Sequence, residues 1–240
     1  MVDDMTEINS NLYYHSKQQK GVDRRTKEFI VERCMPFMKG ADVLDMGYVD
    51  EMWTDAIIRQ GWRSHIVEGS ESHIAHARER FEENNDVTIH HAMFEDFTPD
   101  RLYNTIIAGD ILRYITEPVI FLDRLRTWLV PGGRLIVTIP NSKSLHRRIG
   151  SLLNMESHPD EANKRDIEVG NLRSYDRYSL RHEILQAGLN IQEIRGCFLK
   201  PLSSLQIESW DNALLRAFLE IGDELEDYAW FIYAICENRR

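Results

Sequence analysis

The stretch VLDMGYVDEMWTDAIIRQGWRSHIVE, Val43–Glu68, decides the fold of this chain. Its start, Val43–Met46, is a mainly apolar run with the length of a short buried strand, and Gly47 follows it directly. Trp53–Gln60 has the spacing of a helix, and Ser64–Glu68 has the pattern of a second strand. A strand, a helix and a second strand in this order are typical of parallel strands joined by a crossover helix.

The same alternation continues along the whole chain. Further helices are predicted at Asp23–Met38, Glu71–Phe81, Pro118–Leu129, Leu180–Gln186 and Asp211–Ile221. Further strands are predicted at Val87–His91, Thr105–Ala108, Arg134–Ile139, Asn190–Leu199 and Tyr228–Cys236. We therefore expect an α/β fold with a seven-stranded, mostly parallel, doubly wound sheet and helices on both faces. No linker or repeat divides the sequence, so residues 1–240 are expected to form a single domain that begins with a helical segment at 1–40.

Composition and charge narrow the class of protein. Of the 240 residues, 42% are hydrophobic and 28% are charged, as in ordinary globular proteins. The formal net charge of −10 argues against nucleic acid as a partner, because phosphate binding needs a basic surface. No apolar run approaches the ~18–20 residues of a membrane span, and the acidic start MVDDMTEINS does not resemble a signal peptide. We expect a cytoplasmic protein with no membrane contact, whose cysteines pack as small hydrophobic residues.

Two residues point to a ligand site at the ends of the strands. In an open α/β sheet, ligands bind at the carboxyl ends of the strands, near the point where the strand order reverses. Gly47 begins the turn after the first strand, and a glycine there lets the backbone approach a ligand. A tight turn without a ligand explains Gly47 equally well. Glu68, however, ends the second strand about 20 residues later, where Rossmann-like domains place the acidic side chain that receives ribose hydroxyls.

Four segments carry a resemblance to a known family. Val43–Thr54, VLDMGYVDEMWT, resembles the first motif of the class I S-adenosylmethionine-dependent methyltransferases, usually VLDLGCGxGxxT. Leu129–Gly150, LVPGGRLIVTIPNSKSLHRRIG, is similar to a subgroup of small-molecule methyltransferases found with sugar, surface-polysaccharide and natural-product pathways, and Gly170–Leu180 with Gly196–Trp210 extends the similarity. The resemblance covers about residues 10–237. It implies the Rossmann-like class I methyltransferase fold, with S-adenosylmethionine as cofactor and S-adenosylhomocysteine as product.

The resemblance also implies a set of cofactor-binding residues. They are Tyr14, Asp45, Gly47, Tyr48, Glu68, Gly69, Met93, Phe94 and Gly109. Within this set, Gly47 and its turn would lie against the methionine part, and Glu68 would hold the ribose. Met93 and Phe94 would flank the adenine, and Tyr13 or Tyr14 would close over the cofactor.

Three residues are candidates for the chemistry, and four for substrate binding. By resemblance, Asp110 would face the methyl group, and Tyr114 stands where the family often has a histidine. His146 has a side chain whose ordinary pKa suits a general base at neutral pH, although a lone histidine in a basic stretch more often has a structural role. The segment 141–179 is expected to form a lid or insertion on the substrate side. Within it, an anionic substrate would meet Arg147, Arg148, Arg173 and Tyr175, unless these form a solvated helix face.

Several residues depart from the family pattern. Glycines are expected at Val49 and Glu51. A β-branched residue resists positive φ at a cost of about 1–2 kcal/mol, and Glu51 adds negative charge near the cofactor's carboxylate. Met93 stands where an acidic residue often meets the adenine amino group, Arg113-Tyr114 replaces a Glu-His pair, and Asn171 replaces a histidine. Together these changes indicate either a reshaped cofactor pocket or a lost one.

Two functions therefore remain open. The first is an S-adenosylmethionine-dependent methyltransferase that transfers a methyl group to oxygen or nitrogen of a small polar molecule, such as a sugar or a natural-product intermediate. The second is a non-catalytic relative that acts as a binding or partner subunit of an active paralogue. A homodimer, or a heteromer with a related methyltransferase, is compatible with both. No metal is expected, because the pairs His73/His76 and His90/His91 lack a third ligand.

Overall fold

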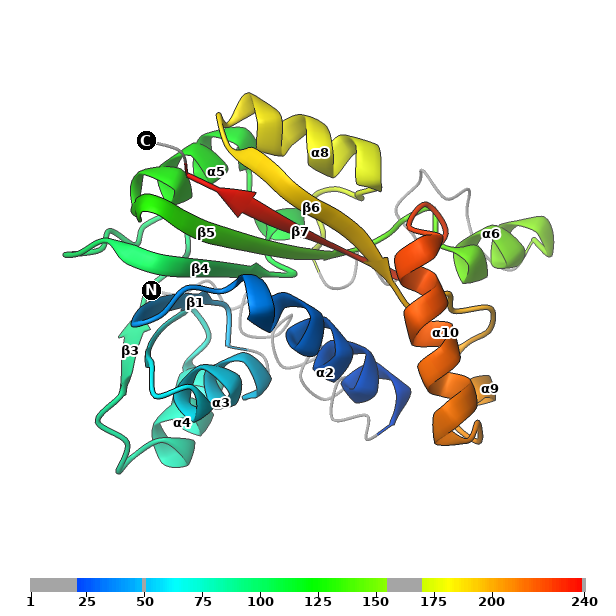
Figure 1. Cartoon of the computed structure of the whole chain (residues 1–240), viewed down its shortest axis with the longest axis horizontal. Coiled ribbons are helices and arrows are strands. Elements are labelled where there is room, and N and C mark those ends of the chain that lie inside the picture. The colour runs from blue at the N-terminus through cyan, green and yellow to red at the C-terminus, as the bar shows by residue number, and fades with distance from the viewer. Residues whose placement is uncertain (1–20, 49–50, 155–169, 239–240) are drawn as a thin grey trace.

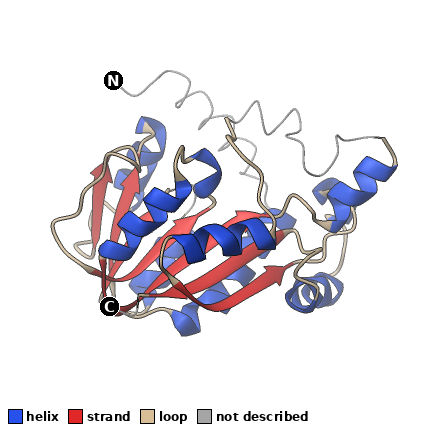
Figure 2. Cartoon of the chain, turned by 90° about the horizontal axis from the view of Figure 1, so that it is seen from above, coloured by secondary structure: helices blue, strands red, loops and turns tan. Residues whose placement is uncertain are grey.

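The computed structural model describes residues 21–48, 51–154 and 170–238. They contain a seven-stranded sheet in the order β3-β2-β1-β4-β5-β7-β6, with helices on both faces (Figures 1 and 2). The strands are β1 (Asp42–Met46), β2 (Arg63–Glu68), β3 (Val87–His91), β4 (Tyr103–Gly109), β5 (Leu129–Pro140), β6 (Asn190–Cys197) and β7 (Phe231–Glu237). The α-helices are α2 (Val22–Cys34), α3 (Met52–Arg59), α4 (Glu71–Arg80), α5 (Pro118–Thr127), α6 (Leu145–Leu152), α8 (Arg177–Gln186), α9 (Ser204–Ile207) and α10 (Asn212–Glu224).

The predicted mostly parallel sheet is confirmed. β1 to β5 pair in parallel, and β7 lies antiparallel between β5 and β6. The strand order reverses between β1 and β4, so the crossover helices lie on opposite sides of the sheet. Tyr14 and Val49 lie outside the described residues, as do parts of the predicted segments 1–40 and 141–179.

Two apolar layers hold the sheet between its helices. Residues of the central strands alternate between the layers: Leu44 and Ile106 face α5 and α8, whereas Val43 and Ile107 face α2 and α10. Because both faces are covered, the central strands are mainly apolar, as is usual for parallel strands. Three free, buried cysteines belong to this packing, as the sequence predicted: Cys34, Cys197 and Cys236.

The ends of some elements differ from the sequence prediction. Helix α6 lies in the segment 141–179 and is not among the predicted helices, because its basic residues obscure the apolar spacing of Leu145, Ile149 and Leu152. Strand β6 ends at Cys197 because Phe198 has a φ of 65°, a left-handed conformation that interrupts a strand. The backbone carbonyl of Phe198 accepts instead from the N–H of Trp230, 2.7 Å away.

Gly222 on α10 tests the close packing of this helix on the end of β6. A Cβ on Gly222 would enter the space of the Phe198 backbone nitrogen and would lie 2.8 Å from the carbonyl carbon of Cys197. Alanine normally favours a helix over glycine by about 1 kcal/mol. Here Gly222→Ala should instead lower the free energy of unfolding by about 1–3 kcal/mol, because the backbones must move apart. Urea denaturation measures the change.

The matched control is Ala217→Gly on the exposed side of α10. It removes helix propensity without changing a contact, so it should cost about 1 kcal/mol. A Gly222→Ala variant as stable as the parent chain would contradict the close approach of α10 to β6.

Candidate functional site

The candidate site lies at the carboxyl edge of the sheet, where the strand order reverses. Met46 at the end of β1 pairs with Val67 in β2 and with Ala108 in β4, and Gly109 pairs with Thr138 in β5. The strands therefore end side by side, and the loops that follow them are neighbours. This is the position at which open α/β sheets bind their ligands.

Gly47 brings three of these loops into contact. Its φ is 94°, a conformation that favours glycine, and its N–H donates to the carbonyl of Val67 at 2.9 Å. A Cβ on Gly47 would lie 3.0 Å from Cγ2 of Ile111 and 3.4 Å from Cζ of Phe94. The turn after β1 therefore touches the loops after β3 and β4. No side chain larger than hydrogen fits at this position without moving its neighbours.

The Glu68 carboxylate is fixed by backbone N–H groups. Oε2 accepts from the N–H of Tyr48 at 2.9 Å, and Oε1 accepts from the N–H groups of Gly69 and Ser70, both at 2.8 Å. Nδ1 of His73 lies 3.6 Å from Oε2. Glu68 is buried, and a carboxylate offers about four lone-pair sites, so the three backbone donors leave about one for a ligand. Glu68 thus joins the turn after β1 to the loop that leads into α4.

Gly69 and Met93, two of the predicted cofactor-binding residues, lie beside the Glu68 carboxylate, whereas the ring of Tyr48 points away from it. Sδ of Met93 lies 2.8 Å from the position of a Cβ on Gly69, so Met93 covers that glycine. The ring of Tyr48 is buried against α4, edge-to-face with Phe81, and its hydroxyl lies 3.4 Å from Nδ1 of His76. Tyr48 therefore gives the site its backbone N–H and not its ring.

Polar groups from α3 and β5 meet at the end of β4. Asp110 has a φ of 62° and a buried side chain, and its Oδ1 accepts from Oγ1 of Thr138 at 3.0 Å. A Cβ on Gly109 would lie 3.6 Å from Nε1 of Trp53 and 3.9 Å from Oγ1 of Thr138. The sequence indicated Gly109 and Asp110, placed Trp53 only within a predicted helix, and did not single out Thr138. A signal for Trp53 existed, because it directly precedes Thr54 of the first motif.

One hydrogen bond and one ion pair hold α3, the helix that follows the turn at Gly47. Asp45, buried in β1, accepts from Oγ1 of Thr54 in α3 at 3.1 Å. Glu51, which replaces a family glycine, lies directly before α3, and its Oε1 is 3.5 Å from Nη1 of Arg24 in α2. Arg24 therefore offsets the negative charge that Glu51 adds to this edge.

The comparisons with known proteins agree with this arrangement. A family model described as a methyltransferase domain matches residues 14–194. The chain belongs to this methyltransferase family. No curated protein matches the sequence significantly.

Solved structures of low sequence identity share the fold. An S-adenosylmethionine-dependent methyltransferase from Mesorhizobium loti has a TM-score of 0.62 at 15% identity, over 90% of this chain and 100% of that one. The N-methyltransferase NodS from Bradyrhizobium japonicum, in complex with S-adenosylhomocysteine, has a TM-score of 0.61 at 14% identity, over 99% and 100%. The cyclase SpnF has a TM-score of 0.59 at 17% identity, over 90% and 80%. The predicted fold of the S-adenosylmethionine-dependent methyltransferases is therefore confirmed.

His146 lies in an apolar environment on α6. Its Nδ1 is 3.1 Å from Oγ of Ser144, and its ring is edge-on to Trp230, with centroids 6.2 Å apart. Burial, together with the positive charges of Lys200 and Arg147, lowers the pKa of His146 to about 3. The ring is therefore neutral at pH 7, and it is a weak base compared with an ordinary histidine.

The predicted substrate-binding residues contact several parts of the protein itself. Nε of Arg148 donates to the carbonyl of Lys143 at 2.7 Å, and its guanidinium lies over the Tyr228 ring. Arg173 donates to the carbonyl of Thr116 at 2.8 Å. Tyr175 is buried, and its hydroxyl donates to Glu183 at 2.7 Å. Arg147 is partly buried beside His146. The guanidinium of Arg113 lies over the Tyr114 ring, with its Cζ 5.0 Å from the ring centroid.

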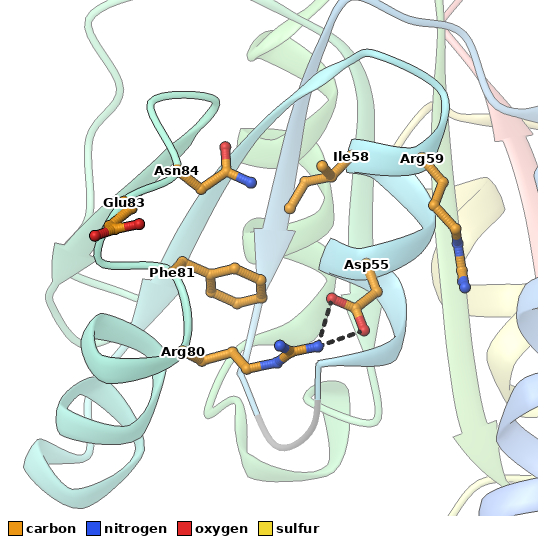
Figure 3. A pocket seen from close by; sticks show the side chains of 7 residues that line it. All are labelled: Asp55, Ile58, Arg59, Arg80, Phe81, Glu83 and Asn84. Atoms are coloured by element: carbon orange, nitrogen blue, oxygen red, sulfur yellow. Dashed lines mark hydrogen bonds and ion pairs between the residues drawn. The ribbon is translucent and has the colours of Figure 1, made fainter.

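A separate cavity of about 530 Å³ opens between α3 and α4 (Figure 3). Its lining residues are Asp55, Ile58, Arg59, Arg80, Phe81, Glu83 and Asn84. The ion pair between Arg80 and Asp55, at 3.2 Å, crosses it. Since Arg59 and Asn84 come shortly before β2 and β3, the cavity lies toward the amino edge of the sheet. It contains none of the residues that the sequence assigned to a site.

Residues 21–48, 51–154 and 170–238 contain no cluster of three histidine, cysteine or acidic side chains arranged to hold a metal ion. None of the helices within them is both long enough and apolar enough to cross a membrane.

Acid should destabilise the folded chain through buried histidines. Burial lowers the folded-state pKa values of His65, His90 and His146 below the ordinary value, and that of His146 falls to about 3. Below about pH 6.5 the unfolded chain binds protons at these rings that the folded chain does not bind. The free energy of unfolding should therefore fall as the pH falls below about 6.5, by about 1.4 kcal/mol per pH unit for His146, until the pH reaches about 3.

Urea denaturation between pH 4 and pH 7 measures this slope. His146→Gln should remove the contribution of one histidine from this slope. His182→Gln, at an exposed position on α8, is the matched control. An identical slope in the parent chain and in His146→Gln would show that His146 is not buried as a neutral ring.

Proposed function

We propose that this chain is an S-adenosylmethionine-dependent methyltransferase that transfers a methyl group to oxygen or nitrogen of a small polar molecule, such as a sugar or a natural-product intermediate. One observation carries the proposal. The left-handed turn at Gly47, the buried carboxylate of Glu68 and the Gly109-Asp110 turn meet at the point where the strand order reverses in a sheet of the methyltransferase family.

The chemical groups at this edge fit S-adenosylmethionine. Glu68 has a lone pair left for a ribose hydroxyl, and Met93 and Phe94 supply apolar surface for the adenine. Gly47 permits a close backbone approach, and the carboxylate of Asp110 suits the cationic end of the amino acid part. When bound, the cofactor supplies a methyl group on a sulfonium centre. The side chains of this edge then hold and orient the reactants, which is the main requirement of an in-line displacement.

Neither candidate residue is suited to remove a proton from the substrate. Asp110 lies at the end of β4 beside Thr138, where its carboxylate would face the cationic end of the cofactor. His146 has a pKa of about 3 and contacts Ser144 and Trp230 instead. A group with so low a pKa is a weak proton acceptor at neutral pH.

The basic residues after β5 support an acceptor with an anionic group. Arg147, Arg148 and Arg173 lie in or near the predicted substrate-side segment 141–179 of a chain whose net charge is −10. Guanidinium groups bind carboxylates and phosphates in bidentate geometry. Tyr175 takes a packing role instead, because its buried hydroxyl donates to Glu183.

A specific observation favours a second function, that of a non-catalytic partner subunit. Glu68 is already held by the N–H groups of Tyr48, Gly69 and Ser70 without any ligand. Glu51 also replaces a family glycine. A chain that kept the fold but lost the cofactor would have these features.

Calorimetric titration with S-adenosylmethionine and S-adenosylhomocysteine separates the two functions. We expect micromolar binding by the parent chain. Glu68→Gln keeps the shape of the side chain but removes its charge, and it should weaken binding by about tenfold or more, since hydrogen bonds to charged groups are the stronger ones. Glu68→Ala should abolish binding.

Glu79→Gln, at an exposed position on α4, is the matched control and should bind as the parent chain does. Circular dichroism confirms that each variant is folded. Absence of binding in the folded parent chain would overturn the methyltransferase proposal and favour the partner subunit.

A further inference from the structure

The cavity between α3 and α4 has the size of a small-molecule site. Its volume of about 530 Å³ falls within the ~300–1,000 Å³ of pockets that hold small ligands. Ile58 of α3 and Phe81, directly after α4, form two apolar walls of the cavity (Figure 3). The described residues that line it include none from the candidate cofactor site, so a ligand here would be separate from the cofactor.

Arg80 brings a cation to one end of the cavity. Its Nη2 alone makes the ion pair with Asp55, 3.2 Å from one carboxylate oxygen and 3.4 Å from the other. Among residues 21–48, 51–154 and 170–238, Nε and Nη1 of Arg80 have no hydrogen-bond partner. Because a guanidinium group donates through five N–H groups, Arg80 can keep Asp55 and also bind an anion. The side chain of Arg80 is 49% exposed, so a ligand can reach it.

Asn84 brings a neutral donor to the other end of the cavity. Its Oδ1 accepts from the backbone N–H of Asp86 at 3.0 Å, which fixes the orientation of the amide. The amide nitrogen therefore points toward Ile58 (Figure 3). The carboxylate of Glu83, another lining residue, points away from the Phe81 ring in the same view. The two ends of the apolar surface thus both present hydrogen-bond donors.

The apolar wall also contacts the residue that holds Glu68. The rings of Phe81 and Tyr48 meet edge-to-face, with centroids 6.2 Å apart, and the N–H of Tyr48 donates to Oε2 of Glu68 at 2.9 Å. A ligand that packs on Phe81 restricts its ring to the position in which it meets Tyr48. Such a ligand therefore favours the turn geometry in which Tyr48 donates to Glu68.

We propose that this cavity is a regulatory site for a small aromatic carboxylate with a second oxygen at the far end of its ring, and that its occupation strengthens cofactor binding. The ring packs against Phe81 and Ile58. The carboxylate accepts from the charged donor, Arg80, and the second, neutral oxygen accepts from the neutral donor, Asn84. The binding site depends on the cavity alone, whereas its effect on the cofactor rests on the proposed function.

Calorimetry with three naphthalene probes tests the binding site. 6-Hydroxy-2-naphthoate has both oxygen groups, 2-naphthoate lacks the hydroxyl, and 2-naphthol lacks the carboxylate. We expect the parent chain to bind 6-hydroxy-2-naphthoate with a Kd of about 1 mM or below. 2-Naphthoate should bind about fivefold more weakly, the effect of one neutral hydrogen bond, and 2-naphthol about tenfold more weakly, the effect of a charged one.

Two variants assign the ends of the ligand. Arg80→Gln removes the cation and should weaken both carboxylates about tenfold while sparing 2-naphthol. Asn84→Ala removes the amide donor and should weaken 6-hydroxy-2-naphthoate and 2-naphthol about fivefold while sparing 2-naphthoate. Arg78→Gln, at an exposed position on α4 outside the cavity, is the matched control for Arg80→Gln. Thermal melting shows whether each variant is folded.

Titration with S-adenosylhomocysteine tests the effect on the cofactor. A coupling factor of about five is usual for two linked sites. At a 6-hydroxy-2-naphthoate concentration that half-saturates the parent chain, such a factor should tighten S-adenosylhomocysteine binding about threefold. The same concentration occupies little of Arg80→Gln, in which the change should be less than about 1.5-fold.

The outcomes separate this inference from the proposed function. If the folded parent chain binds no naphthalene probe, or if Arg80→Gln weakens all three equally, the inference falls and the methyltransferase proposal stands. If the probes bind as expected but the affinity for S-adenosylhomocysteine does not change, the regulatory role falls. If the folded parent chain binds no S-adenosylhomocysteine, the proposed function falls, and the three probes still decide whether the cavity is a binding site.

Discussion

The buried carboxylate of Glu68 holds together the loops on which the candidate site depends. A charge removed from water needs several hydrogen-bond donors, and Glu68 finds them in the backbone N–H groups of Tyr48, Gly69 and Ser70. These donors come from two loops, so their hydrogen bonds hold the ends of β1 and β2 in a fixed relative position. The N–H of Tyr48 must point toward Glu68, and its ring packs instead on Phe81 of α4. The same turn places Gly47 against the loops after β3 and β4.

Residues of the first motif also make contacts with other parts of the chain, which a comparison with the family motif does not show. The loss of family glycines at Val49 and Glu51 suggested a pocket that was either reshaped or lost. For Glu51 the structure shows a compensating contact, because Arg24 from α2 pairs with it. An exposed pair of this kind adds little stability, but it lowers the negative potential at an edge that would receive a carboxylate. The first motif therefore has to be considered together with its neighbours in space and not only along the chain.

The sequence predicted the parts of the molecule that follow from local pattern. Alternating apolar runs fixed the strands, and the rule that parallel strands end at one edge brought Gly47 and Glu68 together. Contacts between distant residues were not predictable. The pKa of His146 is low because Trp230 and Lys200, far along the sequence, surround its ring. The indole N–H of Trp53 in α3 lies close to Gly109, which is far along the sequence in β4. Helix α6 was missed because basic residues interrupt its apolar spacing.

A shared fold does not determine the reaction, because a cyclase and an N-methyltransferase both match this chain in structure. The reaction depends on the side chains of the site. At this edge the decision depends on how Glu68 divides its lone pairs between backbone and ligand. A ribose hydroxyl that donates to Glu68 adds to the hydrogen bonds that already order the two loops, and so it binds a geometry that exists beforehand. A ligand that had to displace the N–H of Tyr48 would instead loosen the turn at Gly47. Cofactor affinity and loop order are therefore coupled, and each must change when the other does.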